Sequence, residues 1–415
     1  MKKNVFFLFS FFIAKGITFL APILLADILT KNDFGMLEYA LAGVGMLLNS
    51  IISLGVPGAY PYFILRTKEK NIEEGFSLHP LWLLFAFLLN LLFYYGFNLY
   101  GIEIYMAANI SYIIGLQKFY STILKSQEKI NKAVLLEAGI YLLLFSFLIG
   151  YFLKLIQPNI FNINIVILSY ALFLVCYSLY KFFKVNKKQI FIKYRRIISF
   201  SIHLLFSSSF LFLLTVSGRI LSKYFFDYET TGVYGFYFRI AAIVVLIYQV
   251  ISVRYFKDLY TKSASKLDFY FSSFYLFIST LSLLIYFLAP YIIPYFSNYF
   301  KETYSENRIV FFILFCQMTM WIASALNSSI VDREGLAKVN NWYFLGLFIF
   351  SALGLYLHRD YLTLSSLTFI LYSLFFIANI TQFLALRTKK IIFKKSLLSL
   401  TFVYITSCLM LILIS

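Results

Sequence analysis

The fold is decided at the start of the chain by two apolar stretches and the polar turn between them. The sequence reads FFLFSFFIAKGITFLAPILLADIL (residues 6–29), then TKNDFG (30–35), then a second apolar stretch that ends at Tyr62. Each stretch has at least the ~20 residues that a helix needs to cross the hydrocarbon core of a bilayer. Lys15 stands inside the first stretch and Glu38 at the start of the second. The pattern predicts a membrane-spanning helical hairpin with charge inside its apolar spans.

The composition supports a membrane protein. The chain has 415 residues, of which 61% are hydrophobic and 13% charged, whereas soluble proteins are about half apolar and a quarter charged. The apolar run after Lys2 and Lys3 is too long for the core of a signal peptide, so we expect no cleavable leader. The bilayer is therefore the expected solvent for this chain.

Applied along the whole chain, the length criterion predicts thirteen spans. They lie near residues 5–29, 36–64, 79–99, 102–124, 133–155, 164–183, 199–224, 233–253, 269–294, 308–330, 340–357, 362–386 and 396–415. The stretches are continuously apolar and lack the alternation of barrel strands, so we expect an all-α protein despite its 50 Phe and 34 Tyr.

The formal net charge of +18 does not indicate nucleic acid, because the cations are unevenly placed. Most Lys and Arg fall in connections on one side of the predicted spans. The positive-inside rule then puts the N-terminus in the cytoplasm of a multi-pass inner-membrane protein.

A weak internal repeat relates the two halves of the chain. Phe34–Tyr39 aligns with Thr231–Phe236, and the Lys125–Lys132 connection resembles Val331–Lys338. An even number of spans separates the copies, which predicts two parallel six-helix lobes around a central cavity. The expected domains are an N-terminal lobe (1–183), a basic cytoplasmic linker (184–198), a C-terminal lobe (199–386) and an extra C-terminal span (387–415).

Four cations are candidates for binding an anionic head group in such a cavity: Lys15, Arg219, Lys223 and Arg239. Intramembrane charges are costly and persist where they face a cavity or a partner, and a guanidinium suits phosphate. Counted from Lys3, Lys15 lies about 18 Å along its helix, which is too deep for easy snorkelling. For Arg219 and Lys223, which share a helix face, snorkelling to the outer interface is the alternative.

Three acids and one helix break complete the candidate site. Asp27, Glu38 and Glu137 are expected either to pair with cavity cations, to take up a coupling proton, or to be solvated helix-end charges. Gly55 and Pro57 interrupt the second span, where they mark either a gate or the end of the helix.

The sequence carries no recognisable catalytic motif. No nucleophile stands beside a His base, no cluster has metal-ligand spacing, and no glycine-rich phosphate loop precedes Lys and Ser or Thr. We therefore expect no enzyme activity, no metal and no cofactor.

The Asp33–Phe34–Gly35 turn, the turn around Gly232 and the Lys125–Lys132 connection resemble those of the bacterial polysaccharide flippases of the multidrug/oligosaccharidyl-lipid/polysaccharide exporter superfamily. The O-antigen and repeat-unit flippases are the most similar members. The resemblance implies two parallel six-helix lobes, alternating access, and basic cavity residues on the first and eighth helices, which Lys15 and Arg239 match. It also implies undecaprenyl-pyrophosphate-linked oligosaccharide as substrate, with a polysaccharide polymerase and a chain-length regulator as partners.

Two other functions stay open at this stage. An O-antigen polymerase is equally apolar but needs a large outer loop with arginines, and the predicted loops are short. A multidrug exporter of the same superfamily would favour an acidic cavity, whereas the intramembrane charges here are mostly basic.

Overall fold

The computed structural model describes residues 2–183, 189–254 and 262–414. Within these ranges the regular structure is entirely helical, because a helix satisfies its backbone hydrogen bonds internally and needs no partner strand in lipid. The chain divides into two compact units, Met1–Ser209 and Phe210–Ser415, called here the N-terminal and the C-terminal unit. Residues 184–188 of the expected linker lie outside the described ranges, and residues 190–198 are helical. The division falls inside helix α11 (Ile190–Phe225) and not at the linker.

The N-terminal unit contains ten α-helices and several short helical turns. They are α1 (Lys2–Ile28), α2 (Lys31–Glu38), π-helix η1 (Tyr39–Val44), α3 (Gly45–Ile52), α4 (Val56–Pro61), π-helix η2 (Tyr62–Arg66), η3 (Lys70–Ile72), α5 (Glu73–Phe76), α6 (His79–Leu91), π-helix η4 (Leu92–Gly96), α7 (Ile102–Ser126), α8 (Ile130–Glu137), α9 (Gly139–Phe152) and α10 (Ile160–Phe183).

The C-terminal unit contains the end of α11 and seven further α-helices. They are α12 (Tyr228–Ala241), η5 (Ala242–Val244), α13 (Val245–Arg254), α15 (Ala264–Ile292), η6 (Ile293–Tyr295), α16 (Asn298–Arg333), α17 (Ala337–Leu357), η7 (Arg359–Tyr361), α18 (Leu364–Arg387) and α19 (Lys394–Ile414).

Each of the thirteen stretches expected to span the membrane is mainly helical over its described residues. In the described part of the chain, ten helical segments are long and apolar enough to cross a membrane, and an eleventh is counted if α8 and α9, bent by 57°, form one span. The two other expected spans are α7 and α11. Helix α7 is surrounded by other helices and buries Asn109, Gln117 and Ser121, so it is less apolar than a lipid-facing span. Helix α11 includes side chains outside the described set.

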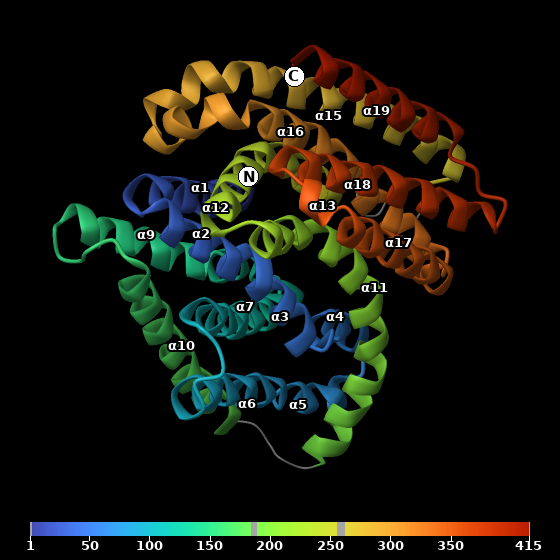
Figure 1. Ribbon diagram of the computed structural model, residues 1–415. Helices are drawn as coiled ribbons and strands as arrows, with labels where there is room; N and C mark the ends of the chain where they lie inside the picture. Colours follow the sequence, from blue (N-terminus) through green and yellow to red (C-terminus); the bar gives the residue numbers. More distant parts are fainter. Residues whose placement is uncertain (1, 184–188, 255–261, 415) are drawn as a thin grey trace. The chain divides into compact units, whose positions relative to one another are not determined.

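Each unit is built around one buried helix. In the N-terminal unit α7 packs against α3, α6, α8 and α10, as Figure 1 shows. In the C-terminal unit α16 packs against α12, α15, α18 and α19, and 83% of its apolar window is buried. These central helices position the polar groups described below.

The predicted repeat has a local counterpart at the hairpin turns. Thr30 caps the start of α2, where its side chain accepts a hydrogen bond from Asp33 N, and Asp227 caps α12 by accepting one from Thr230 N. Thr30 lies five residues before Gly35, and Asp227 lies five residues before Gly232. The same capping interaction thus recurs at matching positions of the two aligned segments. The arrangement of two six-helix lobes around a central cavity stays a prediction.

Helix α19, expected to be an extra span, is an integral part of the C-terminal unit. It packs against α15, α16 and α18. The Asp268 carboxylate of α15 accepts hydrogen bonds from Lys395 N at 2.9 Å and Ser396 N at 2.7 Å. Asp268 therefore caps α19 from a neighbouring helix, which satisfies backbone donors that the first turn leaves open.

Candidate functional site

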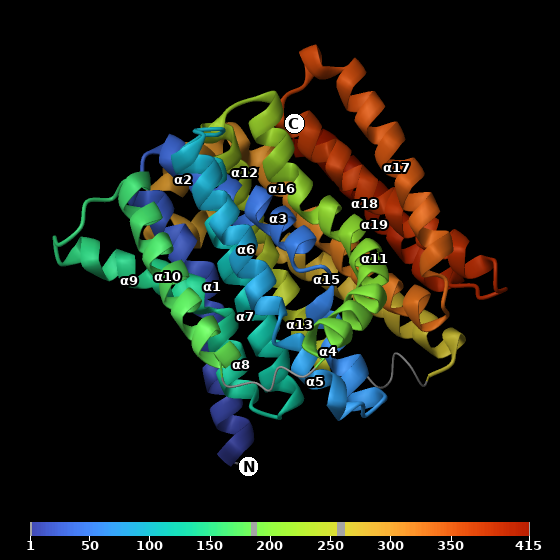
Figure 2. The same ribbon diagram turned by 90° about the horizontal axis from the view of Figure 1, so that it is seen from below.

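Lys15 belongs to a charged cluster at one end of the N-terminal unit. Figure 2 shows the first turns of α1 projecting beyond the ends of α7 and α8. The depth of Lys15 in the membrane stays a prediction. The Lys15 ammonium lies 5.8 Å from the centre of the Phe11 ring and close enough to Glu137 and Lys125 for electrostatic interaction.

Glu137 is the acidic member of this cluster. Its Oε1 accepts a hydrogen bond from Ser121 Oγ at 2.7 Å and forms an ion pair with Lys125 Nζ at 2.5 Å. The Glu137 side chain is 34% exposed, so the pair is only partly shielded from solvent. The sequence left open whether Glu137 pairs with a cation or is a solvated helix-end charge. In the structure its carboxylate pairs with Lys125.

A second basic group, Lys118, was missed by the sequence analysis. It lies within the predicted span 102–124 but was not among the candidate cations, and in the structure it lies inside α7, ahead of its last two turns. Its ammonium donates to Asn49 Oδ1 of α3 at 3.0 Å, and Asn49 Nδ2 donates to Ser111 O at 3.1 Å. The sequence could have identified Lys118 as a candidate, because apolar residues follow it as they follow Lys15.

The two acids of the first hairpin differ in burial. Asp27 is half-buried near the end of α1, whereas Glu38, the last residue of α2, is fully buried. A solvated helix-end charge therefore does not describe Glu38. The π-helix η1 follows it directly, and such interruptions of an α-helix are frequent at functional sites.

The break in the second expected span is centred on Gly55. Leu54 and Gly55 have φ angles of 50° and 69°, and α4 starts immediately afterwards. A Cβ on Gly55 would lie 2.3 Å from Ser201 O of α11, so both its backbone angle and its close approach require glycine. Pro57 stands in the first turn of α4, a position that proline tolerates, so it begins a helix and does not kink one.

The C-terminal unit buries two arginines. Arg219 of α11 is 4% exposed, and its guanidinium lies 4.6 Å from the centre of the Phe238 ring of α12. Arg239 is 7% exposed and lies near the middle of the candidate span Tyr228–Gln249. A charge at this position in a membrane span is costly unless it faces a cavity or a partner.

Lys223 lies at the edge of this group. It is half-buried near the end of α11, with its ammonium 4.3 Å from the centre of the Tyr228 ring. This placement beside an aromatic ring near a helix end is typical of a snorkelling lysine.

Tyr234 connects the helices that carry these arginines. Its ring lies directly over Gly218 of α11, where an added Cβ would meet the Tyr234 hydroxyl at 2.0 Å. Tyr234 also interacts electrostatically with Arg219 and by a side-chain hydrogen bond with Gln317 of α16. The structure thus brings Arg219 next to α12 and α16, with polar groups around it.

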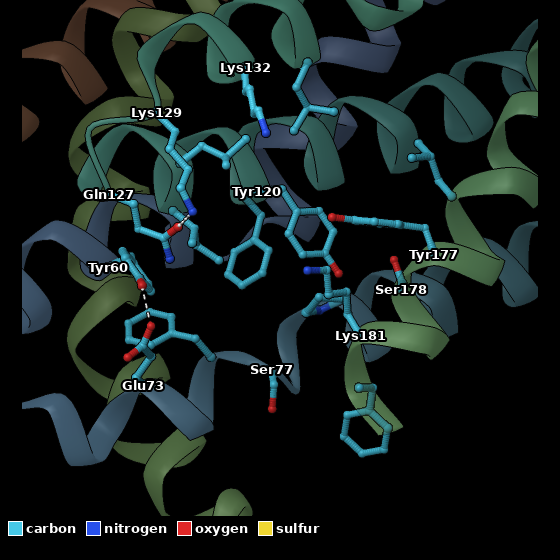
Figure 3. A pocket seen from close by; sticks show the side chains of 18 of the residues that line it. Tyr60, Glu73, Ser77, Tyr120, Gln127, Lys129, Lys132, Tyr177, Ser178 and Lys181 are labelled. Atoms are coloured by element: carbon cyan, nitrogen blue, oxygen red, sulfur yellow. Dashed lines mark hydrogen bonds between the residues drawn. The ribbon is translucent and has the colours of Figure 1, made fainter. Parts of the chain in front are cut away.

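A cavity of about 680 Å³ opens within the N-terminal unit, and none of the predicted site residues lines it (Figure 3). Its walls come from α4–α6, α7, the α7–α8 connection, α8 and α10. Among the described residues, no group of three His, Cys, Asp or Glu side chains is placed to hold a metal ion.

The many apolar helices and the charges buried among them define a multi-pass helical membrane protein. A family model described as polysaccharide biosynthesis protein matches residues 1–254, which is more than half of the chain. The chain therefore belongs to the polysaccharide biosynthesis protein family. Searches of curated proteins and of solved structures return no match. The family match confirms the polysaccharide part of the resemblance, and the narrower prediction of an O-antigen flippase stays a prediction.

Proposed function

We propose that this protein is a flippase. Its substrate would be an O-antigen or similar polysaccharide repeat unit linked to undecaprenyl pyrophosphate, carried from the cytoplasmic to the periplasmic leaflet of a bacterial inner membrane. The observation that carries the proposal is membership of the polysaccharide biosynthesis family together with an arginine buried near the middle of a membrane span. Placing a charged side chain at such depth costs about 2.5–3.5 kcal/mol on insertion scales, a cost that a transport site explains.

In this proposal the buried cations recognise the diphosphate. The guanidinium groups of Arg239 and Arg219 offer paired N–H donors that match phosphate oxygens, while Lys15 and Lys223 add positive charge nearer the ends of the path. The polyprenyl tail would stay in lipid while the head group crosses between two six-helix lobes by alternating access. No bond is made or broken in this process, so we propose no enzyme activity and no cofactor.

The acids and the helix break would control the cycle. Glu38 is the strongest candidate for coupling to an ion gradient, because it is a fully buried carboxyl group next to a π-helix. Asp27 and Glu137 would balance the cations when the substrate is absent. Gly55 would supply the hinge, since its left-handed backbone and its contact with α11 allow little other than glycine.

The test is complementation of a flippase-null strain, read as the ladder of surface polysaccharide. Arg239→Ala should abolish the ladder at normal protein level, whereas Arg359→Ala, at an exposed arginine paired with Asp360, should leave it intact. Lys15→Ala should abolish the ladder as well, since the proposal places both cations in the transport path.

Other outcomes would contradict the proposal. Chains of single repeat units in a deletion strain would indicate a polymerase, because transport would then still occur. A deletion that changes drug susceptibility but not polysaccharide would indicate a multidrug exporter. An unchanged ladder in Arg239→Ala would remove the cation site from the proposal.

A further inference from the structure

The cavity within the N-terminal unit has the features of a lipid site. It lies at the end of the unit that carries the α7–α8 connection and the last turn of α10. Lys129 extends toward it from the connection, Lys132 from the first turn of α8, and Lys181 from α10, as Figure 3 shows. All three lysines are exposed, so their charges are available to a ligand at the mouth of the cavity.

Few acidic side chains line the cavity, so the positive charge of these three lysines is largely uncompensated. Lys129 donates to the neutral Gln127 Oε1 at 3.1 Å, and the Lys181 ammonium lies 5.6 Å from the centre of the Tyr177 ring. The acid that lines the cavity is Glu73, which accepts a hydrogen bond from Tyr60 OH at 2.8 Å. Three cations against one carboxylate favour an anionic ligand.

The interior of the cavity offers two hydroxyl groups. Ser178 is fully buried on α10, and its Oγ lies near the Tyr120 hydroxyl of α7. Neither hydroxyl makes a hydrogen bond of ordinary geometry within the described ranges. Buried polar atoms are usually satisfied, so an oxygen-rich ligand in the cavity would supply the missing partners.

An apolar groove continues from the cavity. It has a volume of about 590 Å³ and shares Lys132, Leu136 and Tyr170 with the cavity. The rest of its wall is formed mainly by Leu135, Leu142 and Leu143, on both sides of the bend between α8 and α9. On α10, Phe173 is 63% exposed at the cavity wall. A charged mouth followed by an apolar groove matches a head group followed by acyl chains.

We propose that this cavity and groove bind an anionic glycerophospholipid of the bilayer. The phosphate would lie among Lys129, Lys132 and Lys181, the glycerol oxygens near Ser178 and Tyr120, and an acyl chain along the groove. Basic pockets between membrane helices bind anionic head groups in this way. Exposed lysines bind an anionic head group only weakly. The site is therefore occupied when the lipid is abundant in the bilayer, which excludes a scarce polyprenyl carrier. The site is independent of the proposed transport substrate.

The experiment uses the purified full chain, delipidated in detergent and titrated with phosphatidylglycerol or phosphatidylcholine of matched acyl chains. Bound lipid is counted by native mass spectrometry. We expect phosphatidylglycerol to bind roughly tenfold more tightly than phosphatidylcholine, since each basic residue near an anionic lipid contributes severalfold. Equal binding of the two lipids would overturn the proposal, as would tighter binding of a polyprenyl phosphate at the same concentration.

Two pairs of variants locate the site. The triple variant Lys129→Gln, Lys132→Gln, Lys181→Gln should lose the preference for phosphatidylglycerol. The matched triple Lys338→Gln, Lys390→Gln, Lys394→Gln, at exposed lysines of the other unit, should keep it. A preference retained by the first triple would refute the head-group site.

The second pair tests the groove. Ser146→Phe fills the groove at an exposed serine, and we expect weaker binding of both lipids. Ser169→Phe places the same ring on an exposed face of α10 outside both pockets, and should bind as the wild type does. Equal binding by these two variants would contradict the acyl-chain assignment. Their elution as single folded species is checked by size-exclusion chromatography.

Discussion

The central helices of the two units are surrounded by polar groups of different kinds. Helix α7 of the N-terminal unit and α16 of the C-terminal unit each lie among neighbouring helices and carry buried polar groups. Around α7 charged groups lie beside them: half-buried Lys118 is bonded to Asn49, and exposed Lys125 is paired with Glu137. Around the apolar part of α16 they are neutral amides and hydroxyls.

The neutral network of α16 is a ladder of hydrogen bonds between helices. Tyr275 OH of α15 donates to Asn327 Oδ1 at 3.2 Å, and Asn327 Nδ2 donates to Asn379 Oδ1 of α18 at 2.9 Å. Gln382 Nε2 donates to Ser324 O at 3.1 Å and to Ser328 Oγ at 2.9 Å. Hydrogen bonds of this kind hold membrane helices together at about 0.6 kcal/mol each.

This difference in charge indicates which polar groups serve stability and which serve function. Neutral amides join helices without the insertion cost of an ion, whereas a buried lysine is expensive and an apolar residue could fill its space. The charges around α7 are therefore expected to serve binding or transport, and the amides around α16 to serve stability. Three substitutions test this comparison.

Of these three substitutions, Lys118→Met in α7 is expected to have the largest effect. Methionine keeps most of the side-chain volume and removes the charge, so the melting temperature should stay close to that of the wild type. The polysaccharide ladder of a complemented null strain should fall by roughly tenfold or more, the equivalent of about 1.4 kcal/mol. Lys118→Arg keeps the charge and should retain more activity. A melting temperature that falls while the ladder is unchanged would assign Lys118 a structural role.

Asn379→Ala should show the converse behaviour in the C-terminal unit. The change removes the acceptor for Asn327 and the donor to Met320 O, and leaves buried polar atoms without partners. We expect a loss of about 2 kcal/mol in the free energy of unfolding, measured by thermal unfolding in detergent. Ser351→Ala, at a hydroxyl that bonds the backbone of its own helix, should cost much less. Equal losses for both would argue that the ladder contributes nothing specific.

The smallest effect is expected for Asp268→Ala, which removes the cap of α19. Loss of a helix cap costs about 1 kcal/mol, and the freed end of α19 should exchange its amide hydrogens faster than the rest of the unit. Hydrogen exchange read by mass spectrometry measures this. Asp360→Ala, at an exposed aspartate, is the control. If α19 exchanges at the wild-type rate in Asp268→Ala, the cap does not hold it to α15.

Much of the fold was predictable because its signals are local. Apolar length predicts helices in a bilayer, and each of the thirteen stretches is mainly helical over its described residues. The turn around Gly35 and its counterpart around Gly232 were visible as sequence similarity, and the capping residues Thr30 and Asp227 extend it. The role of α19 was not predictable, since its capping partner Asp268 lies more than a hundred residues away.

The candidate site was predicted in part. Burial of Arg219 and Arg239 agrees with the expectation that intramembrane cations face protein. The depth of Lys15 in the membrane stays a prediction, and the structure places its ammonium near Glu137 and Lys125. Lys118 was grouped with the loop cations although the predicted span 102–124 contains it. Of the two residues expected to interrupt the second span, Gly55 forms the break and Pro57 begins α4.

The sequence by itself determined that this chain is helical, spans a membrane many times and carries cations within its spans, because each of these properties depends on the order of residues along one segment. Only the tertiary structure decided which cation meets which acid, where an amide finds its partner, and where helices leave a cavity. Those outcomes depend on how side chains from distant segments pack. A sequence lists such side chains without saying which of them touch.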